Sequence, residues 1–167
     1  MEFFDVIEKR HSVRAYKDVP VEKEKLDRIL NAAKIAPTAV NAQAFKLFVI
    51  RTKENKEALK KIYGREWFTR PPYVLLVATV KDKCWVRRDG KSYGDVDSAI
   101  VMDHIILAAT AEGLGTCWIG AFDAGAAKRE LGLPDSLEPV AFTPLGYAQD
   151  SYSGKTRKDL GDLVEYR

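Results

Sequence analysis

The sequence predicts an α+β fold in which helices and strands form a layered sandwich. Two observations favour this class: helical and extended patterns alternate along the chain, and the stretches that join the extended runs are irregular after a start with helices. A regular βαβ repeat would instead place one crossover helix after each strand. The 167 residues are 46% hydrophobic and 31% charged, which is typical of a soluble globular protein, and we expect one domain over residues 1–167.

Apolar residues at three- and four-residue spacing predict the main helices. An N-terminal helix carries Phe3 and Ile7 on its apolar face. A second helix covers about residues 22–35, and Pro37 ends it. The longest apolar stripe ends near Gly113, and because small and apolar residues cover most of its surface, we expect a central helix.

Two shorter helices are predicted from their N-terminal capping residues. Thr52 precedes a helical pattern of about residues 53–62, and Asp123 precedes one of about 124–131. The side-chain oxygens of Thr and Asp accept hydrogen bonds from free N–H groups in the first helical turn. Both residues are therefore expected to act as N-caps.

Four extended runs are predicted as strands. Residues 45–50 and 73–80 are apolar and partly β-branched, and we expect the first of them to be buried on both faces, or nearly so. A short strand forms the core of the segment 113–123, and a last strand covers 140–147. The segment 81–93 reads as a surface loop, of a length that is often functional.

Charge and cysteine content exclude several functions. A net charge of +3, from 27 basic and 24 acidic residues, is too small to favour nucleic-acid binding, and no stretch approaches the length of a membrane span. The N-terminus has no signal-peptide pattern, so we expect a cytoplasmic protein. Cys84 and Cys117 stand alone, with two histidines in the chain, so neither a disulfide framework nor a metal site is expected.

One basic segment has the chemistry of an anion site. Arg10, His11, Ser12 and Arg14 follow one another where the N-terminal helix gives way to an extended run. Guanidinium groups offer forked donors that match phosphate and carbonyl oxygens. Taken alone, this pattern also fits an exposed turn that binds nothing.

Three other segments are weak signals by themselves. The loop 37–44 is rich in polar groups, Gly120 permits close approach of a flat ligand, and the basic tail 155–158 fits a solvated terminus. The pair Gly113-x-Gly115 follows a helix and precedes a strand, the reverse of the dinucleotide-binding order. A Rossmann-type nicotinamide site is therefore not expected.

In combination, four segments resemble the ordered motifs of the FMN-dependent nitroreductase family. They are Arg10–Tyr16, Ala36–Gln43, Gly113–Gly120 and Lys155–Arg157. The resemblance extends from about residue 3 to the C-terminus. It implies a sandwich with a central, mainly antiparallel sheet flanked by helices, assembled as an intertwined homodimer with two FMN sites at the subunit interface.

The resemblance also implies which residues bind the flavin. Arg10, His11, Ser12 and Arg14 match the first flavin motif; Pro37, Thr38, Ala39 and Asn41 match the loop supplied by the partner subunit; Ile119, Gly120 and Ala121 match the backbone near the flavin N5 edge; and Lys155 and Arg157 match the cations that close on the phosphate. A phosphomonoester carries a charge of about −1.5 to −2, so converging cations suit it.

The function implied is an NAD(P)H-dependent oxidoreductase that reduces nitroaromatics, quinones or other electron-poor small molecules in a ping-pong cycle. FMN N5 would carry the hydride, no side chain would act as a nucleophile, and Arg14 would stabilise negative charge on the reduced flavin. The family often has Ser-x-x-Asn-x-Gln-Pro-Trp where this chain has Thr38, Asn41, Gln43, Ala44 and Phe45. This departure, together with the short segment 81–93, leaves the substrate range open.

Two alternatives also fit the sequence. One is a specialised flavoenzyme of the same superfamily that acts on another substrate. The other is a non-catalytic protein that stores or delivers FMN. Both would keep the flavin-binding residues, because fold-level analogy determines chemistry only weakly.

Overall fold

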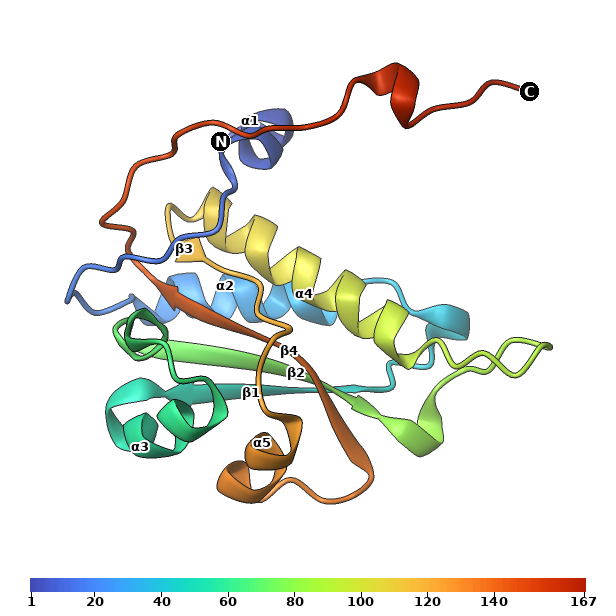
Figure 1. Ribbon diagram of the computed structural model, residues 1–167, viewed down its shortest axis with the longest axis horizontal. Helices are drawn as coiled ribbons and strands as arrows, with labels where there is room; N and C mark the ends of the chain where they lie inside the picture. Colours follow the sequence, from blue (N-terminus) through green and yellow to red (C-terminus); the bar gives the residue numbers. More distant parts are fainter.

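The computed structural model describes all residues, 1–167, and contains one four-stranded sheet with helices on both faces (Figure 1). The strand order is β1-β2-β4-β3, and every strand pair is antiparallel. A single parallel bridge, between Ser12 and Thr116, adds the N-terminal segment beside β3. The predicted α+β class with a mainly antiparallel sheet is thus confirmed.

The helices and strands have the following bounds. The strands are β1 (Phe45–Arg51), β2 (Tyr73–Val80), β3 (Gly115–Thr116) and β4 (Leu137–Gly146). The α-helices are α1 (Phe3–Lys9), α2 (Lys23–Lys34), α3 (Thr52–Ile62), α4 (Gly94–Ala111) and α5 (Ala124–Leu131). Short 3₁₀ turns cover Ala39–Asn41, Glu66–Thr69, Lys81–Lys83 and Leu160–Asp162.

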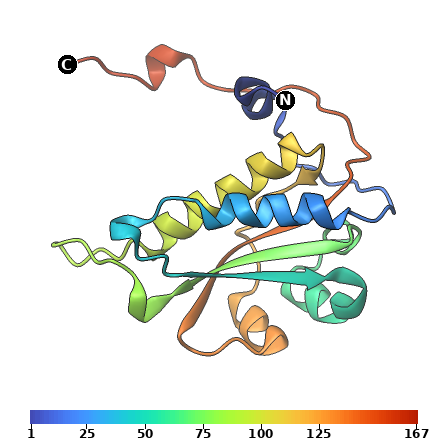
Figure 2. The same ribbon diagram turned by 180° about the vertical axis from the view of Figure 1, so that it is seen from behind.

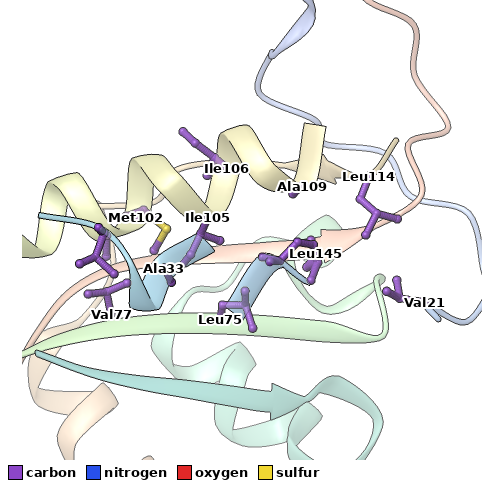
Figure 3. Close-up of a cluster of buried hydrophobic side chains, with 14 residues drawn as sticks. Val21, Ala33, Leu75, Val77, Met102, Ile105, Ile106, Ala109, Leu114 and Leu145 are labelled. Atoms are coloured by element: carbon purple, nitrogen blue, oxygen red, sulfur yellow. The ribbon is translucent and has the colours of Figure 1, made fainter. Parts of the chain in front are cut away.

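Strand β2 lies between two hydrophobic layers, and its side chains point alternately into one layer and the other. Leu75 and Val77 pack with α2 and α4, whereas Leu76 and Ala78 pack with α3 and α5. Figure 3 shows the first layer, and Figure 2 shows the same arrangement from behind. A two-residue side-chain period along a strand produces this division.

Strand β1 differs from the expectation of burial on both faces. It is the edge of the sheet, and Lys46 and Val49 are exposed while Ile50 is buried. The apolar run predicted the strand correctly, but its position at the edge leaves one face uncovered in this chain.

The extents of two strands differ from those expected. Strand β4 begins at Leu137 rather than 140, because Pro139 pairs with Ala78 next to a register irregularity that tolerates proline. Strand β3 is limited to Gly115–Thr116, and Ile119 instead forms an isolated bridge.

The two predicted N-caps have different outcomes. Asp123 caps α5 as expected, accepting the N–H of Ala126 at 2.8 Å. Thr52 was wrongly expected to cap α3: it is the first helical residue, and its hydroxyl is buried without a hydrogen-bond partner. The residue before it, Arg51, has the extended backbone of an N-cap because it ends β1.

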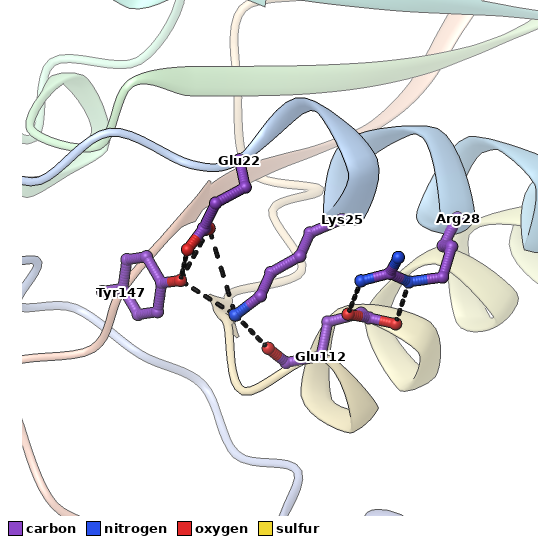
Figure 4. A network of polar contacts seen from close by, with 5 residues as sticks. All are labelled: Glu22, Lys25, Arg28, Glu112 and Tyr147. Carbon is purple, nitrogen blue, oxygen red and sulfur yellow. Dashed lines mark hydrogen bonds and ion pairs between the residues drawn. The ribbon is translucent and has the colours of Figure 1, made fainter.

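A polar network joins the start of α2 to the end of α4 and to the residue after β4 (Figure 4). Lys25 donates to the Tyr147 hydroxyl at 2.8 Å and to the Glu112 carbonyl at 3.0 Å, and Tyr147 donates to Glu22. Arg28 binds the Glu112 carboxylate through two hydrogen bonds of 2.6 and 2.7 Å. These two hydrogen bonds from the Arg28 guanidinium lower the pKa of Glu112.

The Arg28–Glu112 pair predicts a specific sensitivity to acid. Because the folded-state pKa of Glu112 is lowered, its stabilising effect is complete above the unfolded value near pH ~4.3 and is lost as the pH falls through the folded value. In the parent protein, the urea unfolding midpoint should fall between about pH 6 and pH 3. We expect a smaller fall in Glu112→Gln, because this variant has no carboxylate to protonate at position 112. Glu2→Gln, at the exposed N-terminus, is the control. Superimposable pH profiles of Glu112→Gln and the parent protein would contradict this assignment.

No helix combines the length and the apolar character that crossing a membrane requires. No group of three or more His, Cys, Asp or Glu side chains is arranged to hold a metal ion.

Candidate functional site

The basic segment after α1 is fixed between two parts of the sheet. On one side the N–H of Val13 donates to the carbonyl of Thr116 at 2.9 Å, and on the other the N–H of Gln149 donates to the carbonyl of Ala15 at 2.8 Å. A Cβ atom on Gly115 would lie only 2.8 Å from a Val13 methyl group. A glycine is therefore needed where the segment approaches β3 so closely.

Arg14 projects from this segment to the surface. Its backbone N–H donates to the Asp150 carboxylate at 3.1 Å, and its guanidinium carbon lies 5.9 Å from the centroid of the Trp67 ring. The guanidinium itself has no ion-pair partner. Burial raises the pKa of the neighbouring Cys117 thiol, and the positive charge of Arg14 opposes this shift.

The tail brings two further cations to the same segment. The Lys155 ammonium donates to the carbonyl of Ile7 at the end of α1, so the tail crosses this helix (Figure 1). Burial lowers the pKa of Lys155, and the positive charges of Arg10 and Arg157 lower it further. None of these three cations has a carboxylate within ion-pair distance. The negative charge of Glu8 opposes this lowering of the Lys155 pKa. A bound anion would further reduce the repulsion among the cations.

His11 has a polar atom without a partner at this place. Its Nδ1 lies 3.0 Å from the carbonyl of Lys9, which can only accept, so Nδ1 carries the hydrogen. Its Nε2 is buried and has no hydrogen-bond partner, and the ring lies 5.5 Å from that of Tyr152. With the hydrogen on Nδ1, the orphaned Nε2 is an acceptor and fits a hydroxyl or N–H group of a ligand, whereas the unpaired cations fit a phosphate group.

The segment Ile119–Ala121 follows Cys117 on the same side of the molecule. The backbone N–H of Ile119 donates to the carbonyl of Phe142 at 2.9 Å, and the N–H of Phe142 donates to the carbonyl of Ile119 at 3.0 Å. These two hydrogen bonds fix the backbone of Ile119 against β4. Gly120 and Ala121 are exposed, and a Cβ atom on Gly120 would meet nothing within 4 Å. Their backbone is thus open to an approaching ligand.

The loop Thr38–Gln43 has an unusual backbone. Val40, Asn41 and Gln43 have φ values of 48°, 55° and 48°, and this left-handed conformation costs roughly 1–2 kcal/mol for each residue with a Cβ atom. Inside the loop, the Gln43 N–H donates to the Thr38 hydroxyl at 3.0 Å. Outside it, the Ala39 N–H donates to the carboxylate of Asp97, in the first turn of α4, at 2.9 Å.

The predicted cofactor residues therefore fall into two groups that do not meet within one chain. The loop with Ala39 lies against the N-terminal end of α4, whereas the basic segment pairs with β3, just after the C-terminal end of this helix. The 18 residues of α4 span about 27 Å. Figures 1 and 2 both show the two groups at opposite ends of the helix. Arg10–Arg14 and the tail cations form one group, and Pro37–Asn41 forms the other. The segment Ile119–Ala121 is held against β4 at Phe142.

One cavity contains none of the predicted cofactor residues. It has a volume of about 640 Å³ and lies between the start of α3, the segment 18–20 and the Pro71-Pro72 pair. A smaller cavity, of about 250 Å³, lies at the basic segment, and His11, Val13 and Tyr152 are among the residues that line it.

Sequence reasoning missed two residues that shape these groups. Asp150 accepts the Arg14 N–H, and Asp97 fixes the loop at Ala39. Asp97 had a detectable signal, because it lies four residues before Val101 and eight before Ile105, on the apolar face of the helix. The sequence left open whether Trp67, Trp85 or Tyr93 lines the pocket: Trp67 lies beside Arg14, whereas Trp85 packs against Tyr93 in the segment 81–93.

A comparison with protein families matches residues 7–69 and 60–147 to the nitroreductase family. The match includes the basic segment, the loop Thr38–Gln43 and Ile119–Ala121, and it ends before the tail cations. The placement of Lys155 and Arg157 therefore depends on the geometry described above.

Solved structures and curated sequences are similar over nearly the whole chain. A nitroreductase family protein from Clostridium difficile 630 is 40% identical, covers 99% of this chain and 98% of its own, and superimposes with a TM-score of 0.92. An FMN-dependent nitroreductase from Clostridium difficile R20291 is 27% identical, with 98% of both chains covered and a TM-score of 0.83. An NADPH-dependent oxidoreductase from Staphylococcus aureus is 23% identical over 94% of this chain and 69% of its own.

Proposed function

The chain belongs to the nitroreductase family, and from this premise we propose that it binds FMN and uses NAD(P)H to reduce nitroaromatics, quinones or similar electron-poor small molecules. The observation that carries the proposal is the contact of the tail with the end of α1, where Lys155 donates to the Ile7 carbonyl and where Arg10, Lys155 and Arg157 have no carboxylate within ion-pair distance. The relatives named as an FMN-dependent nitroreductase and an NADPH-dependent oxidoreductase support the choice of cofactor and reductant.

The phosphate of FMN is assigned to the tail cations and Arg10. A dianionic phosphate offers several acceptor oxygens, and three converging cations supply charge-assisted donors to it. The free Nε2 of His11 and the Ser12 hydroxyl are further polar groups of the same segment.

The flavin ring is assigned to Arg14 and to the exposed backbone of Gly120 and Ala121. Arg14 has no carboxylate partner, so its charge is available to stabilise negative charge that develops on a reduced ring. FMN supplies reversible hydride chemistry at N5, and reductant and acceptor would take turns at the same open face in a ping-pong cycle. The absence of a side chain at Gly120 keeps this face accessible.

A homodimer follows from the same assignment. The loop with Thr38, Ala39 and Asn41 lies too far from the basic segment of its own chain to reach the same flavin. In a two-fold dimer whose axis passes near the middle of α4, each loop would approach the basic segment of the other chain. Each FMN site would then contain residues from both subunits.

The proposal is tested by visible absorbance of the purified protein with FMN, before and after NADPH or NADH is added without oxygen. We expect a bound-flavin spectrum that bleaches with at least one nicotinamide and recovers when a quinone or a nitroaromatic is added. Parallel lines in double-reciprocal plots would support the ping-pong order.

Two other results would each exclude part of the proposal. A flavin that binds but stays oxidised with both nicotinamides would favour a storage protein or a specialised flavoenzyme with another electron donor. Failure to take up FMN at all would contradict the cofactor assignment.

A further inference from the structure

Asp97 is a buried carboxylate to which the proposed chemistry gives no role. It is 2% exposed in the first turn of α4, where its Oδ1 accepts the Ala39 N–H at 2.9 Å. Its Oδ2 is buried and accepts no hydrogen bond. We propose that Asp97 is a positioning residue for FMN: it holds the loop Thr38–Asn41 in its binding conformation before the cofactor arrives. This inference rests on the proposed function and extends it to a residue outside the flavin-binding set.

The loop needs a restraint from outside because its own backbone is strained. Val40 and Asn41 both have left-handed φ values, which an isolated chain rarely adopts and a β-branched residue such as Val40 adopts least readily. The bond from Gln43 to Thr38 closes the loop on itself but attaches it to no other helix. Among residues 38–42, the Ala39 N–H is the one group that hydrogen-bonds to another helix.

Asp97 can provide this restraint because its own position is rigid. Its N–H donates to the carbonyl of Tyr93 at 2.9 Å, in the first turn of the helix. This turn is attached to strand β2: the hydroxyl of Thr79 bonds to the Ser98 hydroxyl at 2.8 Å and to the Gly94 carbonyl at 3.1 Å. The loop is thus linked through one carboxylate to the centre of the sheet.

The energetics favour a positioning role over a general stabilising one. A buried carboxylate with one oxygen unpartnered is destabilising, and such arrangements persist where they fix a functional conformation. The apparent affinity of a ligand falls in proportion to the fraction of protein in the competent conformation. Release of the loop from Asp97 would therefore weaken FMN binding without removing any atom that contacts the flavin.

Asp97→Ala, Asp97→Asn and Asp95→Ala are the variants that test this inference. Asp95 is the control, since it is a carboxylate of the same helical turn that is exposed and makes no contact with the loop. For each protein, FMN titration gives the dissociation constant, and hydrogen exchange of the FMN-free protein gives the deuterium uptake of residues 37–44. We expect Asp97→Ala to bind FMN about tenfold more weakly than Asp95→Ala and to take up deuterium faster in this segment. Asp97→Asn keeps an acceptor for Ala39 and should restore most of both properties.

Equal FMN affinity and equal uptake in Asp97→Ala and Asp95→Ala would overturn the inference while leaving the proposed function intact. Failure of the parent protein to bind FMN would instead overturn the proposed function.

If Asp97→Ala does not fold, Ala39→Pro removes the same hydrogen bond from the loop side. Thr38 already has the extended backbone that precedes proline readily, with φ −133° and ψ 156°. Faster exchange in the loop and weaker FMN binding by Ala39→Pro would support the inference. Unchanged exchange would overturn it.

Discussion

The double substitution Lys155→Ala and Arg157→Ala is expected to weaken FMN binding by about a hundredfold. Lys155 contacts the end of α1, just before Arg10, and neither Lys155 nor Arg157 has a carboxylate within ion-pair distance. A charge-assisted hydrogen bond to a phosphate contributes about 1.5–3 kcal/mol, and solvent screening reduces this to roughly tenfold in affinity for each exposed cation. Each single variant should lose less than half of the binding free energy that the double variant loses. Removal of one cation also relieves its repulsion with the remaining cations, which offsets part of the lost attraction to the phosphate.

The measurement is quenching of FMN fluorescence at fixed ionic strength. The matched control is Lys53→Ala with Lys158→Ala, which removes the same net charge at two exposed positions that form no ion pair. Riboflavin, which lacks the phosphate, should bind the parent and the double variant with the same affinity. If the control variant loses as much FMN affinity as the test variant, these cations do not hold the phosphate. The same conclusion would follow if the test variant lost as much affinity for riboflavin as for FMN.

Replacement of Phe142 by alanine is expected to destabilise the protein by about 3–5 kcal/mol. Phe142 is fully buried in β4, and its ring makes edge-on contacts with Phe122 and Phe68, at centroid distances of 4.8 and 6.1 Å. Its removal leaves a cavity in the layer that α3 and α5 cover. This is a large fraction of the stability of a typical domain, which is about 5–15 kcal/mol.

Urea unfolding at fixed protein and FMN concentrations measures this change. Phe142→Leu, which keeps most of the buried volume, should cost about 1.5 kcal/mol or less. Val86→Ala, at an exposed position in the segment 81–93, should change stability by about 0.5 kcal/mol at most. A loss below about 1 kcal/mol for Phe142→Ala would mean that the layer repacks around the missing ring.

Local sequence patterns predicted most of the secondary structure, because periodicity and capping act over a few residues. The helix predicted for about residues 22–35 is α2 at Lys23–Lys34, and the strand predicted for 73–80 is β2 without any shift. The Asp123 cap depends only on an N–H three residues away, so it was also predictable. Thr52 satisfied the same local rule but failed as a cap, because β1 continues directly into α3 at this point.

Non-local pairing determined what these patterns could not reveal. The position of β1 at the sheet edge follows from the strand order, and no feature within residues 45–50 indicates it. The start of β4 at Leu137 likewise depends on an irregularity in its pairing with β2, which makes Pro139 acceptable inside a strand.

The sequence by itself determined the fold class, the family resemblance and the types of residue available to bind an anion, because these depend on composition and on short motifs in order. The tertiary structure decided which of those residues meet. It brought Lys155 to the end of α1, far away in sequence, and it separated the basic segment from the loop at Ala39 by the length of α4. It also selected Asp97 as the partner of this loop. Packing against the sheet sets these distances, and a linear pattern of residue types carries no information about them.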